Sequence, residues 1–115
     1  MQLEGDDKRQ CLRVPYPETC RPILVIGKYQ YDVIDISELG VRFLCSTEQT
    51  TLEPGTDIDA VLTLHDTKPF NVQGRLIRIS KRFSAARMAF KEKVPVEMLL
   101  QEQRFISERF PGSVD

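Results

Sequence analysis

The stretch Asp35-Ile36-Ser37-Glu38-Leu39-Gly40 determines the architecture, because it ends one apolar segment and leads directly into another. Successive side chains of an extended chain point to opposite faces. Asp35 and Ser37 therefore share one face, while Ile34 and Ile36 take the other. The stretch predicts two consecutive strands joined by a tight turn, with two polar side chains on one face at the end of the first strand.

The segments on either side of this stretch also have the character of strands. Residues 22–26 form an apolar run closed by Gly27-Lys28, so we expect residues 29–36 to pair with them as a hairpin. Gly40 permits a backbone conformation that a Cβ atom would penalise, and residues 41–45 form the third predicted strand.

Three more strands are expected downstream, at residues 58–64, 70–79 and 86–90. Residues 58–64 alternate between apolar and polar side chains, which is typical of a half-buried strand. In residues 70–79 the apolar phase changes at Leu76-Ile77. That change predicts a bulge or a sharp bend, a common device for curving a sheet into a barrel.

A C-terminal helix is predicted between Pro95 and Pro111-Gly112. Its expected apolar stripe, interrupted only by Gln103, contains Val96, Leu99, Leu100, Ile106 and Phe110. Six strands and one helix with short connections predict a mainly β protein, a small six-stranded antiparallel barrel.

The 115 residues suit a single domain, divided into an arm at residues 1–18, a barrel at residues 19–93 and a helix at residues 95–110. Because the arm is polar and contains Pro15 and Pro17, we expect it to be flexible and to lie outside the core.

Composition argues against several classes of function. The net charge of -1 and the pI near 5.9 provide no protein-wide positive field for a long nucleic acid. The N-terminus lacks the features of a signal peptide, and no apolar run is long enough to span a membrane, so we expect a soluble cytoplasmic protein.

The sequence has an odd number of cysteines, Cys11, Cys20 and Cys45, and they form no C-x-x-C pair. This argues against a disulfide framework or a zinc site. His65 is the only histidine, and no Ser or Cys is placed to form a triad with it, so we expect a loop residue after a strand and no enzymatic site.

Two short motifs supply the candidate binding residues. Arg9 and Arg13 are four residues apart, which leaves both guanidinium groups on one side of the chain. An arginine can fork onto the O6/N7 edge of guanine, lie flat on a purine or pair with a phosphate. The carboxylate of Asp35 can accept hydrogen bonds from the Watson–Crick edge of guanine, and Ser37 adds a hydroxyl on the same face.

The combination of R-x-x-x-R at Arg9 to Arg13 with D-x-S-x-x-G at Asp35 to Gly40 resembles the PilZ domain, a bacterial receptor module for cyclic di-GMP. The resemblance covers nearly the whole chain and implies a split-barrel-like fold that binds cyclic di-GMP and signals to a separate effector protein, with no metal and no cofactor. It also implies that the strand bearing Arg78 lies near the rim of the ligand site. In such domains a basic residue before R-x-x-x-R favours a stacked pair of ligands, and Lys8 occupies that position here.

Other interpretations of the same residues remain. Without a ligand, Arg9 and Arg13 would form surface ion pairs with neighbouring carboxylates, and Asp35 and Ser37 would only shape a turn. The chain would then be a PilZ-fold adaptor that works through protein contacts. An OB-like barrel that stacks single-stranded nucleic acid is a third possibility, against which the absence of Trp and the acidic pI argue. Three helix side chains off the apolar stripe are candidates for contact with another protein: Met98, Glu102 and Phe105.

Overall fold

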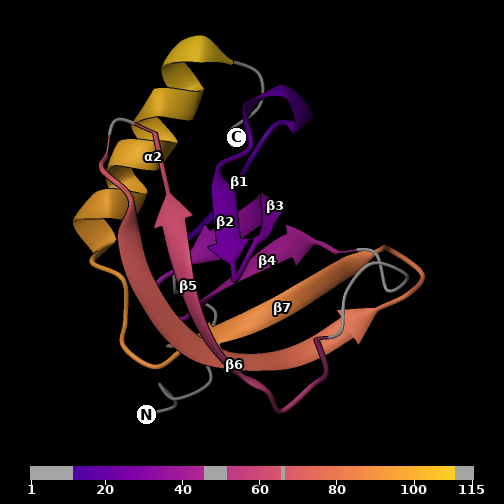
Figure 1. Cartoon of the computed structure of the whole chain (residues 1–115). Helices are drawn as coiled ribbons and strands as arrows, with labels where there is room; N and C mark the ends of the chain where they lie inside the picture. The colour runs from indigo at the N-terminus through magenta and orange to yellow at the C-terminus, as the bar shows by residue number, and fades with distance from the viewer. Residues whose placement is uncertain (1–11, 46–51, 66, 111–115) are drawn as a thin grey trace, which may run out of the picture.

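A computed structural model of the chain describes residues 12–45, 52–65 and 67–110 (Figure 1). The described elements are β1 (Arg13–Pro15), the short 3-10 helix η1 (Glu18–Cys20), β2 (Ile23–Ile26), β3 (Tyr29–Ser37), β4 (Gly40–Leu44), β5 (Asp57–Thr63), β6 (Phe70–Ser80), β7 (Ala85–Phe90) and α2 (Val96–Arg109). The six strands predicted from the sequence are all present, with ends that differ by at most one residue.

The strands form one antiparallel sheet in the order β1-β3-β2-β5-β6-β7-β4, and an additional β3–β4 pairing closes it. Closure leaves β2 to β7 as a six-stranded barrel, as predicted, with β1 as one extra strand beside β3. Figure 1 shows β6 and β7 as long curved strands that wrap around the barrel, with α2 lying near the ends of β5 and β1. The polar stretch at Asp35 to Gly40 is thus held where β1, β3 and β4 meet.

The barrel interior is filled by alternate side chains of the strands. In β5, Ile58, Ala60 and Leu62 are buried, whereas the intervening Asp59 is exposed. Phe43 and Leu24 are fully buried on β4 and β2. Because inward and outward positions alternate, the polar side chains of the same strands lie on the outer surface of the barrel.

Residues 13–16 join the sheet beside β3 and contribute to the core, which corrects the expectation that the whole of residues 1–18 lies outside the core. β1 pairs with the end of β3, and the backbone N–H of Tyr16 donates to the carbonyl of Ile34 at 2.9 Å. Val14 and Tyr16 are buried in the hydrophobic core. Two apolar side chains are too few for the sequence pattern to reveal β1 as a strand. Pro15 is compatible with β1 because β1 lies at the edge of the sheet.

Two irregularities in register shape the barrel. The pairing of β6 with β7 shifts between Leu76 and Arg78, which confirms the predicted bulge. The extra residue is Ile77, which is 52% exposed. Beyond it the alternation of β6 is shifted by one residue, so that Arg78 points outward. A second shift separates Val33 from Asp35 in the pairing of β3 with β4. Without the bulges, strict alternation would point Asp35 and Arg78 into the barrel. Each bulge turns one of these polar side chains outward.

Gly40 is required by the close approach of β4 to β7. A Cβ atom at Gly40 would overlap the backbone carbonyl oxygen of Met88. The reason is cross-strand contact, because Gly40 is not among the described residues with positive φ. Any larger residue at this position would push β4 away from β7 and disturb the turn that follows Asp35 and Ser37.

The buried face of helix α2 shares Leu99 and Ile106 with the predicted stripe but is shifted toward Glu102. Its buried side chains are Leu99, Glu102 and Ile106, while Val96 and Leu100 are exposed. Met98 and Phe105 are partly buried against the core, and Glu102 is fully buried, so Glu102 is not accessible to a partner protein. The buried stripe includes a carboxylate, which hydropathy alone assigns to the outside. In the described part of the chain, α2 is too short and too polar to cross a membrane.

Candidate ligand-binding site

The predicted site is centred on Asp35, which lies on the outer face of the barrel near the end of β3. One carboxylate oxygen is 2.8 Å from Nη2 of Arg42, the residue opposite it on β4. The other is 3.7 Å from Nη1 of Arg13 on β1. Three strands therefore bring one anion and two cations to the same point on the surface.

The burial of these groups is unequal, and this matters for ligand binding. The side chain of Asp35 is only 7% exposed, whereas those of Arg13 and Arg42 are 49% and 48% exposed. A buried carboxylate is costly unless it is paired, so the two arginines compensate for the burial of Asp35. Each guanidinium group has five N–H donors in a fixed fork. Both arginines can therefore pair with Asp35 and still offer donors to a ligand.

Ser37 and Gly40 form the turn beside this cluster. The hydroxyl of Ser37 accepts a hydrogen bond from the backbone N–H of Leu39 at 3.3 Å and lies 3.5 Å from the carbonyl oxygen of Gly40. The expected serine turn is therefore present. Ser37 is also directly opposite Arg13 in the pairing of β3 with β1, so its buried hydroxyl lies next to the arginine cluster.

A row of arginines extends from Asp35 across the barrel. Arg42 on β4 is opposite Arg87 on β7, which is opposite Arg78 on β6. Directly opposed residues of antiparallel strands lie on the same face, so the three cations share the outer surface. With Phe83 they line a hollow of about 260 Å³ to which no described carboxylate contributes. Like charges in this arrangement repel one another, and an anionic ligand would offset that repulsion.

The structure thus brings together most of the residues predicted from the sequence. Arg13, Asp35, Ser37 and Gly40 meet at the junction of β1, β3 and β4. Arg78 lies at the far end of the arginine row. Lys8 and Arg9 lie outside the described residues, so their predicted roles stay predictions.

Sequence reasoning missed Arg42 and Arg87 as site residues. Arg42 follows Gly40 by two positions, and its side chain alternates with those of Val41 and Phe43, which are buried. That alternation alone places Arg42 on the outer face. Its position opposite Asp35 depends on the bulge in β3, which the sequence pattern did not reveal.

A larger hollow than the one beside the arginine row lies elsewhere, at about 610 Å³ around Gly74. Carboxylates of Asp57 and Asp59 line it, together with Arg75 and Lys91. Asp57 already pairs with Arg75 at 3.2 Å. The mixed charge is poorly suited to a dianion, so size does not make this hollow the better candidate.

A second polar cluster lies where α2 packs on the barrel. Glu102, only 1% exposed, accepts a hydrogen bond from the Tyr16 hydroxyl at 2.6 Å. His65, which follows β5 as predicted, contacts the same carboxylate through Nδ1 at 3.0 Å. Nε2 of His65 is 3.3 Å from Sγ of Cys20. The expectation that no cysteine is placed to form a triad with His65 overlooked Cys20, because folding brings together residues 45 positions apart.

Two solved structures share this fold at low sequence identity. The PilZ domain of YcgR from Escherichia coli, in a structure with c-di-GMP, has a TM-score of 0.66 and 15% identity, and the match covers 91% of this chain and 98% of that one. The Bacillus subtilis inhibitor of motility (MotI/DgrA) has a TM-score of 0.65 and 12% identity. That match covers 91% of this chain and 52% of that one, so the chain spans about half the length of the motility inhibitor.

Sequence comparison gives a more direct assignment. No sequence among the curated proteins matches the chain. The family model of the PilZ domain matches residues 7–108, which include both motifs, the whole barrel and nearly all of α2. The chain therefore belongs to the PilZ domain family.

Proposed function

We propose that this PilZ domain is a cytoplasmic receptor for cyclic di-GMP that passes the signal to a separate effector protein, and that it is not an enzyme. The observation that carries the proposal is the buried carboxylate of Asp35 held between Arg42 and Arg13. Membership of the PilZ family supports it, as does the likeness to a PilZ domain whose structure contains c-di-GMP.

The proposed site reads guanine through complementary hydrogen bonds. The carboxylate of Asp35 accepts from N1–H and the 2-amino group of the base, neither of which adenine offers on that edge. Arg13 and Arg9 fork onto the O6/N7 edge or onto phosphate oxygens. Ser37 contributes its hydroxyl beside Asp35, and Gly40 maintains the turn that positions both side chains.

The arginine row provides the charge that a dinucleotide with two phosphates requires. Arg42, Arg87 and Arg78 lie on three neighbouring strands and lead away from Asp35. A guanidinium group pairs bidentately with phosphate, and several in a row extend the site beyond one base. In this proposal Arg42 changes partners, from Asp35 alone to Asp35 and a ligand phosphate.

Signalling follows from a change in the N-terminal segment. Residues 13–16 are already held against β3, so the segment that the ligand would order is the one that precedes Arg13 and carries Lys8 and Arg9. A ligand that bridges this segment to Asp35 would shift the conformations of the segment toward one docked arrangement. An effector protein would then recognise the docked form.

Isothermal titration calorimetry with cyclic di-GMP, GTP and a short single-stranded oligonucleotide tests this function. We expect saturable binding of cyclic di-GMP, with much weaker binding of GTP and of the oligonucleotide. Binding of none of the three would contradict the receptor proposal and favour the adaptor alternative. Preference for the oligonucleotide would favour a single-strand binding barrel instead.

The same titration measures how many ligands bind. Lys8 adds a cation near the phosphates but lacks the fork and flat surface of an arginine. We therefore expect two cyclic di-GMP molecules per chain, and a ratio that falls toward one in Lys8→Leu. The protein concentration must be well above the dissociation constant. A ratio of one in the unmodified protein would contradict the pairing and leave the receptor proposal intact.

A further inference from the structure

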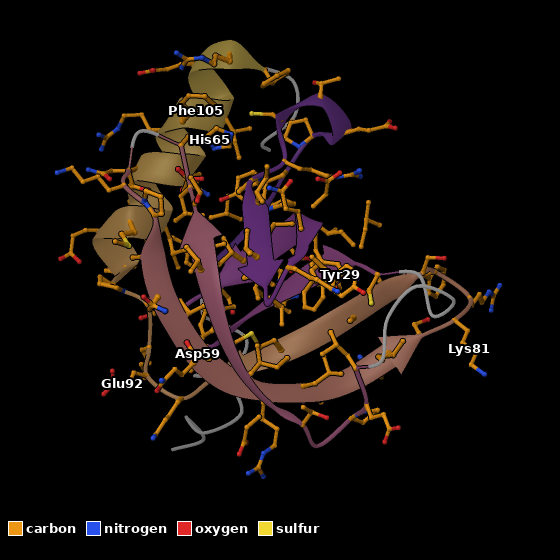
Figure 2. All side chains as sticks on the ribbon, viewed as in Figure 1. Tyr29, Asp59, His65, Lys81, Glu92 and Phe105 are labelled. Atoms are coloured by element: carbon orange, nitrogen blue, oxygen red, sulfur yellow. The ribbon has the colours of Figure 1, made fainter. Side chains whose placement is uncertain are left out.

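The cluster at Cys20, His65 and Glu102 has the geometry of a nucleophile, a base and a group that orients the base. Sγ of Cys20 lies 3.3 Å from Nε2 of His65, and Nδ1 of the same ring lies 3.0 Å from Oε1 of Glu102. Figure 2 shows His65 beyond the end of β5 and Phe105 beside it on α2. The two rings stack with centroids 4.1 Å apart, which fixes the plane of the imidazole.

The contacts of Glu102 determine which ring nitrogen can accept a proton. Its carboxylate accepts from the Tyr16 hydroxyl at 2.6 Å and from the backbone N–H of His65 at 3.1 Å. An acceptor at this position favours the tautomer in which Nδ1 carries the hydrogen and donates to Glu102. The lone pair is then on Nε2, which faces the thiol of Cys20.

A purely structural role for this cluster does not explain why the thiol of Cys20 lies against His65. The three donors from Tyr16 and His65 already satisfy the buried carboxylate of Glu102 without any contribution from Cys20. Cys20 is only partly buried, at the end of η1, so small molecules can reach it. In contrast, Cys45 is buried in the core at 3% exposure.

The charges around Cys20 make its reactivity depend on His65. Desolvation raises the pKa of the Cys20 thiol, and the negative charge of Glu102 raises it further, while Arg109 on α2 acts in the opposite direction. Burial, the hydrogen bond to Glu102 and its charge raise the pKa of Tyr16 far above its ordinary value, so that hydroxyl remains a donor. Cys20 is therefore a protonated thiol at neutral pH and needs a base to react.

We propose that Cys20 is a modification site at which His65 acts as general base, and that its reagent is a small hydroperoxide such as hydrogen peroxide. The sulfur attacks one peroxide oxygen and forms an S–O bond as the O–O bond breaks. The thiol proton passes to Nε2 of His65 and then to the departing hydroxide, which leaves as water. Sulfur is oxidised to sulfenic acid and the peroxide is reduced.

Treatment of the full chain with hydrogen peroxide, followed by trapping with dimedone and mass spectrometry, tests this proposal. We expect Cys20 at pH 7 to react faster than free N-acetylcysteine, and Cys45 to remain unmodified as the buried reference within the same molecule. A rate for Cys20 no greater than that of N-acetylcysteine would overturn the proposal without requiring any variant.

The matched variant is His65→Asn, whose side-chain amide can still donate to Glu102 but offers no base to Cys20. We expect the rate of Cys20 oxidation to fall by about tenfold or more, since general bases contribute factors of this size or larger. Thermal unfolding of the variant shows whether the fold persists. An equal rate in a folded His65→Asn protein would also overturn the proposal. Both readouts are independent of cyclic di-GMP, so the failure of one proposal leaves the other standing.

Discussion

Asp35 and Arg42 are directly opposite one another on β3 and β4, with a carboxylate oxygen 2.8 Å from the guanidinium Nη2. Asp35 is buried, whereas Arg42 is about half exposed. The pair therefore gives a buried carboxylate a partner and leaves arginine donors available at the surface. A ligand that carries both hydrogen-bond donors and phosphates matches this arrangement, because its donors can bind the carboxylate and its phosphates can bind the arginine donors.

Arg42→Ala is expected to weaken binding of cyclic di-GMP by about 1–3 kcal/mol, roughly 5- to 150-fold, because it removes a forked contact next to Asp35. The matched control is Arg75→Ala, which makes the same change in net charge at an exposed ion pair with Asp57. We expect the control to bind like the unmodified protein in calorimetry. Equal weakening by both variants would show that only overall charge matters.

The R-x-x-x-R motif makes a separate prediction. Arg9→Ala and Arg13→Ala should each weaken binding by about 1–3 kcal/mol, again roughly 5- to 150-fold. Arg13 is half exposed and pairs with Asp35 at a longer distance than Arg42 does, so we expect little change in thermal stability. If both single variants bind with the affinity of the unmodified protein, the arginine assignment is wrong.

Selectivity for guanine tests the role of Asp35. Asp35→Asn keeps the shape of the side chain but replaces one acceptor oxygen with a donor, so we expect binding of cyclic di-GMP to be lost. Cyclic di-AMP should bind poorly to the unmodified protein, because adenine presents a donor where guanine has O6 and lacks the donors that Asp35 would accept. Similar calorimetric affinities for the two dinucleotides would rule out this role.

Hydrogen exchange of the N-terminal segment tests the signalling step. The amide of Tyr16 is already bonded within the barrel, so we expect it to be protected with or without ligand. Amides of residues 8–12 should exchange fast in the free protein and slow down when cyclic di-GMP binds. Protection of these amides before any ligand is added would mean that the signal travels by another route.

The barrel could be predicted from the sequence because its evidence is local. Apolar alternation located the six strands, and the change of phase at Leu76-Ile77 located the bulge that turns Arg78 outward. The family motifs located Asp35 and Ser37 on one face. These features depend on neighbouring residues, whose side-chain directions follow directly from strand geometry.

What the sequence did not reveal depends on contacts between distant segments. The buried face of α2 includes Glu102, whose partners Tyr16 and His65 are 86 and 37 residues away. Hydropathy places a lone carboxylate on the surface, and only the assembled fold supplies the donors that allow its burial. The alignment of Arg42 with Arg87 and Arg78 likewise depends on the register of three strands and on the bulge in β6.

The most direct test of the receptor proposal is an NMR titration of the unmodified protein with cyclic di-GMP, followed through assigned backbone amides. We predict that the largest shifts cluster at Arg13, Asp35 and Arg42, where β1, β3 and β4 meet, and extend along the arginine row. The amides of Asp57 and Gln73, at the larger hollow, should change little. Shifts centred on that hollow, or no shifts at saturating ligand, would contradict the account.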